Sequence, residues 1–123
     1  MIVRAIRIRT SPGGPEFAEH PGLRIGAEYR VLEIECGPNG PINFRVLDDQ
    51  HDPTMWPSDC FELVDGAIPQ SWIAAIWSTG TLYLAPERWH RPEFWEEFFD
   101  GRNRGAERIF HEELERMRAE TME

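Results

Sequence analysis

The chain has 123 residues and a formal net charge of -9, and all 13 of its basic residues are arginine. This length predicts one domain that buries roughly two-thirds of the surface exposed by its unfolded chain, without help from a metal or a disulfide. The acidic balance opposes binding to nucleic-acid phosphates and favours encounter with a basic partner. We expect a cytoplasmic protein: no apolar run approaches the roughly 20 residues of a membrane span, and the N-terminus lacks the apolar core of a secretory signal.

The first predicted strand is Ala5–Arg9, where isoleucine and arginine alternate as in a half-buried strand. The stretch from Ser11 to Gly22 is rich in glycine and proline, which predicts a long loop. A loop of this length inside a compact domain is unusual and often functional.

Three short apolar runs within residues 23–64 predict the strands of a small antiparallel barrel. The runs cover residues 29–34, 42–46 and 60–64. The alternation of the first run slips once, between Leu32 and Glu33, and glycine and proline at 37–41 end the run. The second run alternates cleanly, so its apolar side chains share one face.

The segment between the second and third runs has no period. Asp48 and Asp49 end the second run, and Pro53 and Pro57 predict an irregular connection. Trp56 lies in this connection, either buried in the loop or exposed as a binding anchor. An exposed tryptophan ringed by carboxylates suits an arginine- or lysine-rich partner. The predicted partner-binding residues are therefore Asp48, Asp49, Asp52, Trp56 and Asp59.

The segment Trp72–Trp77 suits either a buried strand or a short helix. We favour a hairpin with the run 81–85, because Gly80 stands where a three-residue hairpin loop requires a positive φ. Pro86 then ends the second strand.

Two helices are predicted in the C-terminal third. Pro92 suits the first position of the shorter helix and Gly101 its C-cap. The apolar face of this helix consists of Phe94, Trp95, Phe98 and Phe99. The longer helix covers about 104–120, with an apolar stripe of Ala106, Ile109, Phe110, Leu114 and Met117. We interpret His111, Glu112 and Glu113 as its solvated face.

No set of residues predicts a catalytic site, a metal or a cofactor. The four histidines are scattered without metal-ligand spacing, and the chain contains no nucleophile elbow, phosphate-binding loop or dinucleotide fingerprint. The carboxylates within 93–100 share an exposed helix face, whereas acid catalysis requires a desolvating pocket. Cys36 and Cys60 could pair, but a reducing cytosol favours two free thiols.

Two groups of motifs carry resemblances to known families. The patterns Leu23-x-x-Gly26-x-x-Tyr29-x-Val31, Phe44-x-Val46-x-Asp48-Asp49 and Trp56-Pro57-x-x-x-Phe61-Glu62 resemble bacterial SH3-like domains. The patterns Pro86-Glu87-x-Trp89 and Phe94-Trp95-Glu96-x-Phe98-Phe99-Asp100 resemble segments of the immunity proteins of polymorphic toxins.

These resemblances and the predicted elements together imply a single α+β domain. It consists of a small SH3-like antiparallel β-barrel (1–64), a hairpin (65–90) and two C-terminal helices packed on it (91–123). The resemblance to immunity proteins implies a non-catalytic inhibitor that binds a basic toxin domain. The alternatives are an SH3-like regulatory or adaptor domain that binds another bacterial or phage protein, and an enzyme that uses the scattered acids and histidines.

Overall fold

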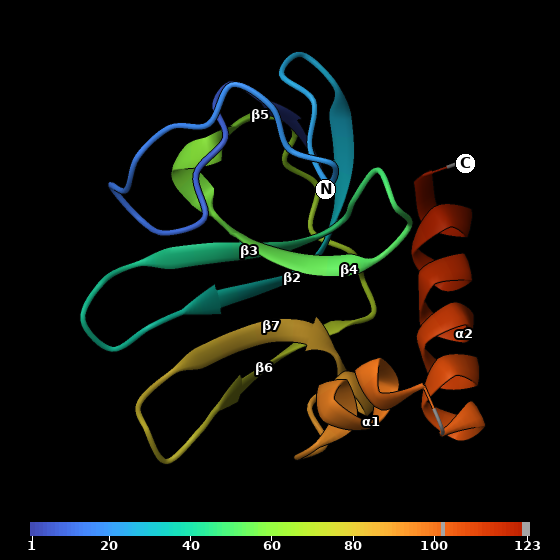
Figure 1. The fold of residues 1–123 in the computed structure, drawn as a ribbon. Coiled ribbons are helices and arrows are strands. Elements are labelled where there is room, and N and C mark those ends of the chain that lie inside the picture. Colours follow the sequence, from blue (N-terminus) through green and yellow to red (C-terminus); the bar gives the residue numbers. More distant parts are fainter. Residues whose placement is uncertain (102, 122–123) are drawn as a thin grey trace.

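The computed structural model describes residues 1–101 and 103–121, which form a seven-stranded, largely antiparallel sheet followed by two α-helices (Figure 1). The α+β prediction, with a hairpin and two C-terminal helices, is therefore confirmed. The strands are β1 (Ile2–Ala5), β2 (Glu28–Cys36), β3 (Ile42–Leu47), β4 (Pro53–Pro57), β5 (Phe61–Asp65), β6 (Trp72–Ile76) and β7 (Leu82–Pro86). The α-helices are α1 (Phe94–Asp100) and α2 (Arg104–Thr121), and short 3-10 turns occupy Ser58–Cys60 and Glu87–Trp89.

Strand β2 is the centre of the sheet. Its first half pairs with β1, and its second half lies between β3 and β7. The order β4-β3-β2-β1-β5, with the β6–β7 hairpin attached to β2, leaves the sheet open among the described residues, so the predicted barrel does not close. The slip of alternation at Leu32 and Glu33 is a β-bulge, where the register of β2 against β3 shifts.

The N-terminal strand lies earlier than predicted, at Ile2–Ala5 and not Ala5–Arg9. The amides of Ile6 and Arg7 both donate to the carbonyl of Cys60, so the chain leaves the regular ladder just after Ala5. Apolar and basic residues continue to alternate as far as Arg9, but the pairing of β1 with β5 ends at Ala5, opposite Phe61.

The irregular connection predicted around Pro53 and Pro57 is also wrong, because these prolines bound strand β4. Every residue of β4 has a partner in β3, from Pro53 opposite Leu47 to Pro57 opposite Asn43. Among the described residues β4 has no second neighbour, and an edge strand tolerates proline because one row of its backbone groups needs no partner.

The predicted hairpin is confirmed. The amide of Gly80 donates to the carbonyl of Trp77, and the amide of Trp77 donates to the carbonyl of Thr81. Gly80 has a φ of 87°, the left-handed conformation that glycine adopts without strain. Strand β7 ends at Pro86, as predicted.

The two helices share an aromatic core with the 3-10 turn that contains Trp89. The ring of Phe110 on α2 lies 5.4 Å from Trp89 and 4.8 Å from Phe98, measured between centroids. Gly101 ends α1 with a φ of 73°, as predicted for a C-cap. The predicted start of this helix is wrong. Pro92 lies in the preceding turn, and α1 begins two residues later, at Phe94.

One prediction for α2 is wrong. Glu113, expected on the solvated face, is only 2% exposed. Its Oε1 accepts a hydrogen bond of 2.8 Å from Nε of Arg88, which comes from the turn after β7. A charged partner from another element therefore allows this carboxylate to be buried. The five residues of the predicted apolar stripe of α2 are buried or half-buried, as predicted.

Candidate functional site

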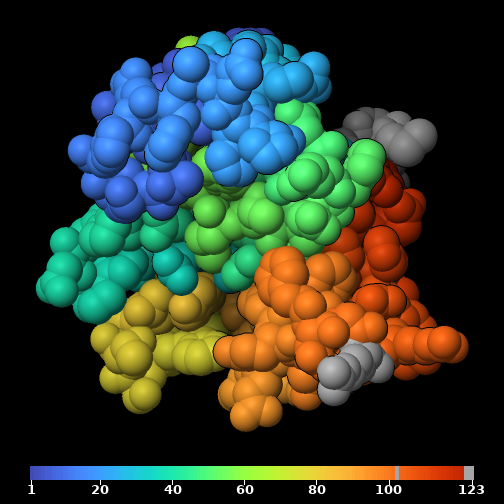
Figure 2. Space-filling view, in the orientation of Figure 1, coloured from blue at the N-terminus to red at the C-terminus, as the bar shows by residue number. Residues whose placement is uncertain are grey.

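A cavity of about 240 Å³ lies between the central strands, the β6–β7 hairpin and α1. We call it the acidic pocket, because four of its lining residues are glutamates: Glu33, Glu35, Glu93 and Glu96. Its aromatic walls include Trp77, Tyr83 and Trp95. In Figure 2 the gold hairpin and the orange helical segment meet below the green and teal strands on this face of the molecule.

The floor of the acidic pocket is a polar face of the sheet. Glu35 on β2 is opposite Asn43 on β3 and Tyr83 on β7, and Tyr83 is in turn opposite Ala75 on β6. Cross-strand neighbours share a face, so these four side chains form one row. Arg45 is opposite Glu33 in the adjacent row.

Glu33 is the buried charge of the pocket, with 3% of its surface exposed. Its Oε2 accepts a hydrogen bond of 3.1 Å from the indole nitrogen of Trp95 and lies 3.8 Å from Nε of Arg45. Burial raises the pKa of the Glu33 carboxyl, and Arg45 and Trp95 oppose that rise. Arg45 is half-buried, and the loss of water lowers the pKa of its guanidinium.

Glu35 is held by neutral donors. Nδ2 of Asn43 donates to Oε1 at 2.9 Å, and the hydroxyl of Tyr83 donates to Oε2 at 3.1 Å. Burial, followed by the nearby charge of Glu35, raises the pKa of Tyr83 to about 12. The phenol therefore remains a hydrogen-bond donor at physiological pH. Its ring also contacts Trp77, with the centroids 5.4 Å apart.

The rim of the pocket adds further negative charge, which Arg91 and His90 in the same lining offset in part. Glu93 and Glu96 also line a shallow depression on α1 together with Glu97 and Asp100, so the two hollows adjoin. Arg91 at the rim is paired with Glu97. Among the described residues, no arginine or histidine forms an ion pair with Glu35, Glu93 or Glu96. Glu93 and Glu96 therefore remain available to a cationic group from outside, whereas both oxygens of Glu35 already accept from neutral donors.

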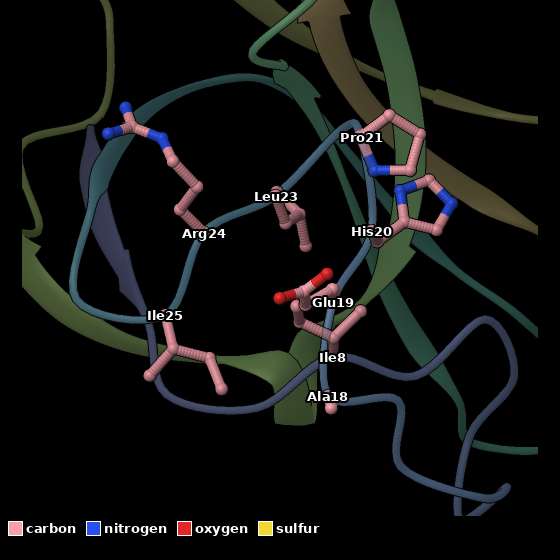
Figure 3. A pocket seen from close by; sticks show the side chains of 8 residues that line it. All are labelled: Ile8, Ala18, Glu19, His20, Pro21, Leu23, Arg24 and Ile25. Atoms are coloured by element: carbon pink, nitrogen blue, oxygen red, sulfur yellow. The ribbon is translucent and has the colours of Figure 1, made fainter.

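A larger depression of about 630 Å³ lies at the long loop, lined by Ile8 and by residues 18–21 and 23–25 (Figure 3). It is more open than the acidic pocket. The guanidinium of Arg24 extends away from the hollow and pairs with Asp49. The ring of His20 is fixed by a bond from the Gly22 amide and by an edge contact with Trp56. Arg24 and His20 are thus engaged elsewhere, and Glu19 is the one acidic side chain in the lining. We therefore consider this depression the weaker candidate.

The predicted anchor Trp56 is not exposed, since only 5% of its surface is accessible. Its indole nitrogen donates to the hydroxyl of Thr54 at 2.8 Å, and that hydroxyl donates to Oδ2 of Asp48 at 3.0 Å. Asp48 is buried as well, and its Oδ1 accepts from the amides of Gln50 and Asp52. These contacts hold the β3–β4 turn, so neither residue forms part of an exposed binding face.

The other predicted site residues are spread over the surface. Asp49 is half-buried and accepts bonds from Arg24 and from the hydroxyl of Tyr29. Asp59 pairs with Arg9 at 2.8 Å. Asp52 is exposed. The structure therefore does not bring the five predicted residues together on one accessible face.

The pocket residues Glu33, Glu35 and Arg45 were absent from the sequence-based prediction. Their alternation with apolar residues places them on the polar face of β2 and β3. In most antiparallel sheets that face is exposed to solvent. The aromatic face of α1 was the available signal, because such a helix must cover some part of the sheet. The sequence does not say which part.

The described residues contain no group of three or more His, Cys, Asp or Glu side chains arranged to hold a metal ion. Within the same part of the chain, no helix has both the length and the apolar character needed to cross a membrane. No protein-family model, curated protein or solved structure matches this chain.

Proposed function

We propose that this chain is a non-catalytic cytoplasmic protein of the immunity type, which neutralises a toxin by binding one of its basic domains directly. The acidic pocket is the observation that carries the proposal. It combines three carboxylates without an ion-pair partner among the described residues with aromatic walls contributed by Trp77 and Tyr83. Carboxylates and aromatic faces together are the usual recognition elements for an arginine or lysine side chain.

The chemistry of the partner follows from charge. The chain carries -9, and the depression on α1 extends the negative surface beyond the pocket. A basic protein domain would be steered toward this surface, whereas a nucleic acid would be repelled. A cavity of about 240 Å³ accommodates one long side chain, so one arginine or lysine of the partner would be the anchor of the interface.

Neutralisation is tested by growth rescue in a bacterial host. The product of the gene next to the one encoding this chain is expressed under an inducible promoter, with and without this chain. We expect that product to stop growth and the wild-type chain to restore it. A neighbouring product that has no effect on growth, or one that remains toxic beside the chain, contradicts the proposal.

The role of the pocket is tested with a triple variant, Glu35→Gln, Glu93→Gln and Glu96→Gln. A matched control, Glu19→Gln, Asp52→Asn and Glu107→Gln, changes the net charge equally at exposed positions outside the pocket. In calorimetric titration with a hexa-arginine peptide, the pocket variant should bind at least about tenfold more weakly than the control. Equal weakening in both variants would show that the peptide responds only to the net charge of the protein and that the pocket is not its binding site.

The SH3-like regulatory or adaptor function remains the second proposal. It would use the same pocket on a basic partner that is not toxic. Capture of a basic partner through the pocket, without growth rescue, would favour this alternative.

A further inference from the structure

Strand β6 is an unprotected edge of the sheet next to the acidic pocket. Its only neighbour among the described residues is β7, and it lies on the side of β7 away from β2 (Figure 1). Its sequence, Trp-Ile-Ala-Ala-Ile, contains no charged residue and no proline. Ile76 is 75% exposed and Trp77, just after the strand, is 40% exposed. Natural edge strands usually carry charges, prolines or bulges that prevent pairing, and β6 has none of these.

The pairing of β6 with β7 determines which backbone N–H and C=O groups of β6 point outward. Trp77 and Thr81 are joined by a backbone hydrogen bond, and opposed residues of an antiparallel pair alternate between bonded and non-bonded. Ala75 and Ile73 therefore direct their backbone groups toward β7, whereas Ala74 and Ile76 direct theirs outward. The outward groups of Ala74 and Ile76 have no hydrogen-bond partner among the described residues.

The side chains of β6 connect this edge to the pocket. Ala75, Tyr83 and Glu35 form one row across three neighbouring strands. A strand added to β6 would place one residue opposite Ala75, about 10 Å from Tyr83 at the usual strand spacing. The methyl group of Ala75 leaves the path over it open, and a long basic side chain would reach the Tyr83 ring near Glu35.

We propose that an extended segment of the basic partner adds an antiparallel strand to β6 and directs an arginine or lysine over Ala75 into the acidic pocket. This inference rests on the proposed function and adds the mode of binding to it. Main-chain hydrogen bonds to Ala74 and Ile76 supply affinity, and the charge in the pocket selects the basic side chain. A second copy of the chain is disfavoured as occupant, because pairing through β6 would bring two acidic pockets together in a protein of charge -9.

The test uses the peptide acetyl-Thr-Val-Arg-Val-Thr-amide, titrated calorimetrically into the full chain. With arginine opposite Ala75, the valine amides face β6 and the arginine amide faces away. N-methylation of both valine amides should weaken binding by about tenfold or more, while N-methylation of the arginine amide should change it by less than about twofold. Equal effects of the two methylated peptides would overturn strand addition.

A protein variant tests the same contact from the other side. Ala74→Pro removes an outward amide that β7 does not use, so the hairpin should remain intact, as checked by circular dichroism. Ala74→Ser keeps the amide and serves as the matched control. We expect the proline variant to lose about tenfold or more in affinity and the serine variant to bind as wild type does.

The pocket triple variant separates this inference from the proposed function. If Ala74→Pro binds the peptide normally and the pocket variant does not, strand addition is wrong and the pocket proposal stands. If the pocket variant binds normally and Ala74→Pro does not, the peptide pairs with β6 but the pocket does not select its basic side chain. The proposed role of the pocket is then wrong. No binding by the wild-type chain, or a dimer seen in sedimentation that Ala74→Pro abolishes, overturns the proposed occupant.

Discussion

The guanidinium carbon of Arg45 lies 3.9 Å from the centroid of the Trp95 ring, which joins the centre of the sheet to α1. The same indole donates its N–H to Glu33 at 3.1 Å. A cation over the face of a tryptophan is worth about 2 kcal/mol or more when water is excluded. Trp95 thus fixes the short helix α1 over Glu33 and Arg45 and forms one wall of the acidic pocket.

Trp95→Phe should destabilise the protein although it retains an aromatic ring. Glu33 would lose the indole donor, and an unsatisfied buried polar group costs about 1–3 kcal/mol. Chemical denaturation measures the change in the free energy of unfolding. Trp77→Phe is the matched control, because Trp77 is partly exposed and should cost less than about 0.5 kcal/mol. Equal costs for the two variants would show that the Glu33 bond is not stabilising.

Glu33 predicts a pH-dependent stability of definite sign. Its pKa is raised by burial, so between the unfolded value of about 4.3 and the folded value the folded protein holds more protons than the unfolded chain. The stability of wild type relative to Glu33→Gln should therefore fall as pH rises through this window and then level off. Urea unfolding of both proteins from pH 4 to 8 measures the difference.

Glu97 should show the opposite sign. Its hydrogen bond with Arg91 lowers its pKa, so its contribution is present above the unfolded value and is lost as pH falls. The stability of wild type relative to Glu97→Gln should accordingly rise with pH. A difference for Glu33→Gln that also rises with pH would contradict the assigned burial effect.

Phe110→Ala should be among the costliest substitutions in the helical region. Phe110 is 1% exposed and stacks on Trp89, so its removal leaves a cavity and should cost about 3–5 kcal/mol. Phe99→Ala is the control for the same change of side chain, since Phe99 is 53% exposed and should cost less than about 1 kcal/mol. A small loss at Phe110 would mean that α2 is only loosely attached.

The two thiols should differ in reactivity. Cys60 is buried, its Sγ contacts the carbonyl of Arg9, and burial raises its pKa, so little nucleophilic thiolate forms. Cys36 is half-buried at the end of β2. Titration of the native protein with a disulfide reagent should show one reacting thiol, which Cys36→Ser removes. Rapid reaction of the Cys36→Ser variant would show that Cys60 is accessible.

The sequence by itself determined the elements whose signals are local. Gly80 and Gly101 marked the hairpin turn and the end of α1, because each position requires a left-handed backbone that glycine supplies cheaply. The period of 3.6 residues located α2 and its stripe, and the single slip at Leu32 and Glu33 located the bulge of β2.

Only the tertiary structure decided which faces became the core and which became the site. Trp56 lies in a strand because β3 pairs with the segment that contains it. Glu113 is buried because Arg88, from the turn after β7, donates a hydrogen bond to its carboxylate. The acidic pocket arose in the same way. Glu33, Glu35 and Arg45 occupy what the alternation marks as the solvent side of the sheet, and α1, distant in the sequence, covers it. Pairings between distant segments depend on loop closure and competing contacts, and no short stretch of sequence encodes them.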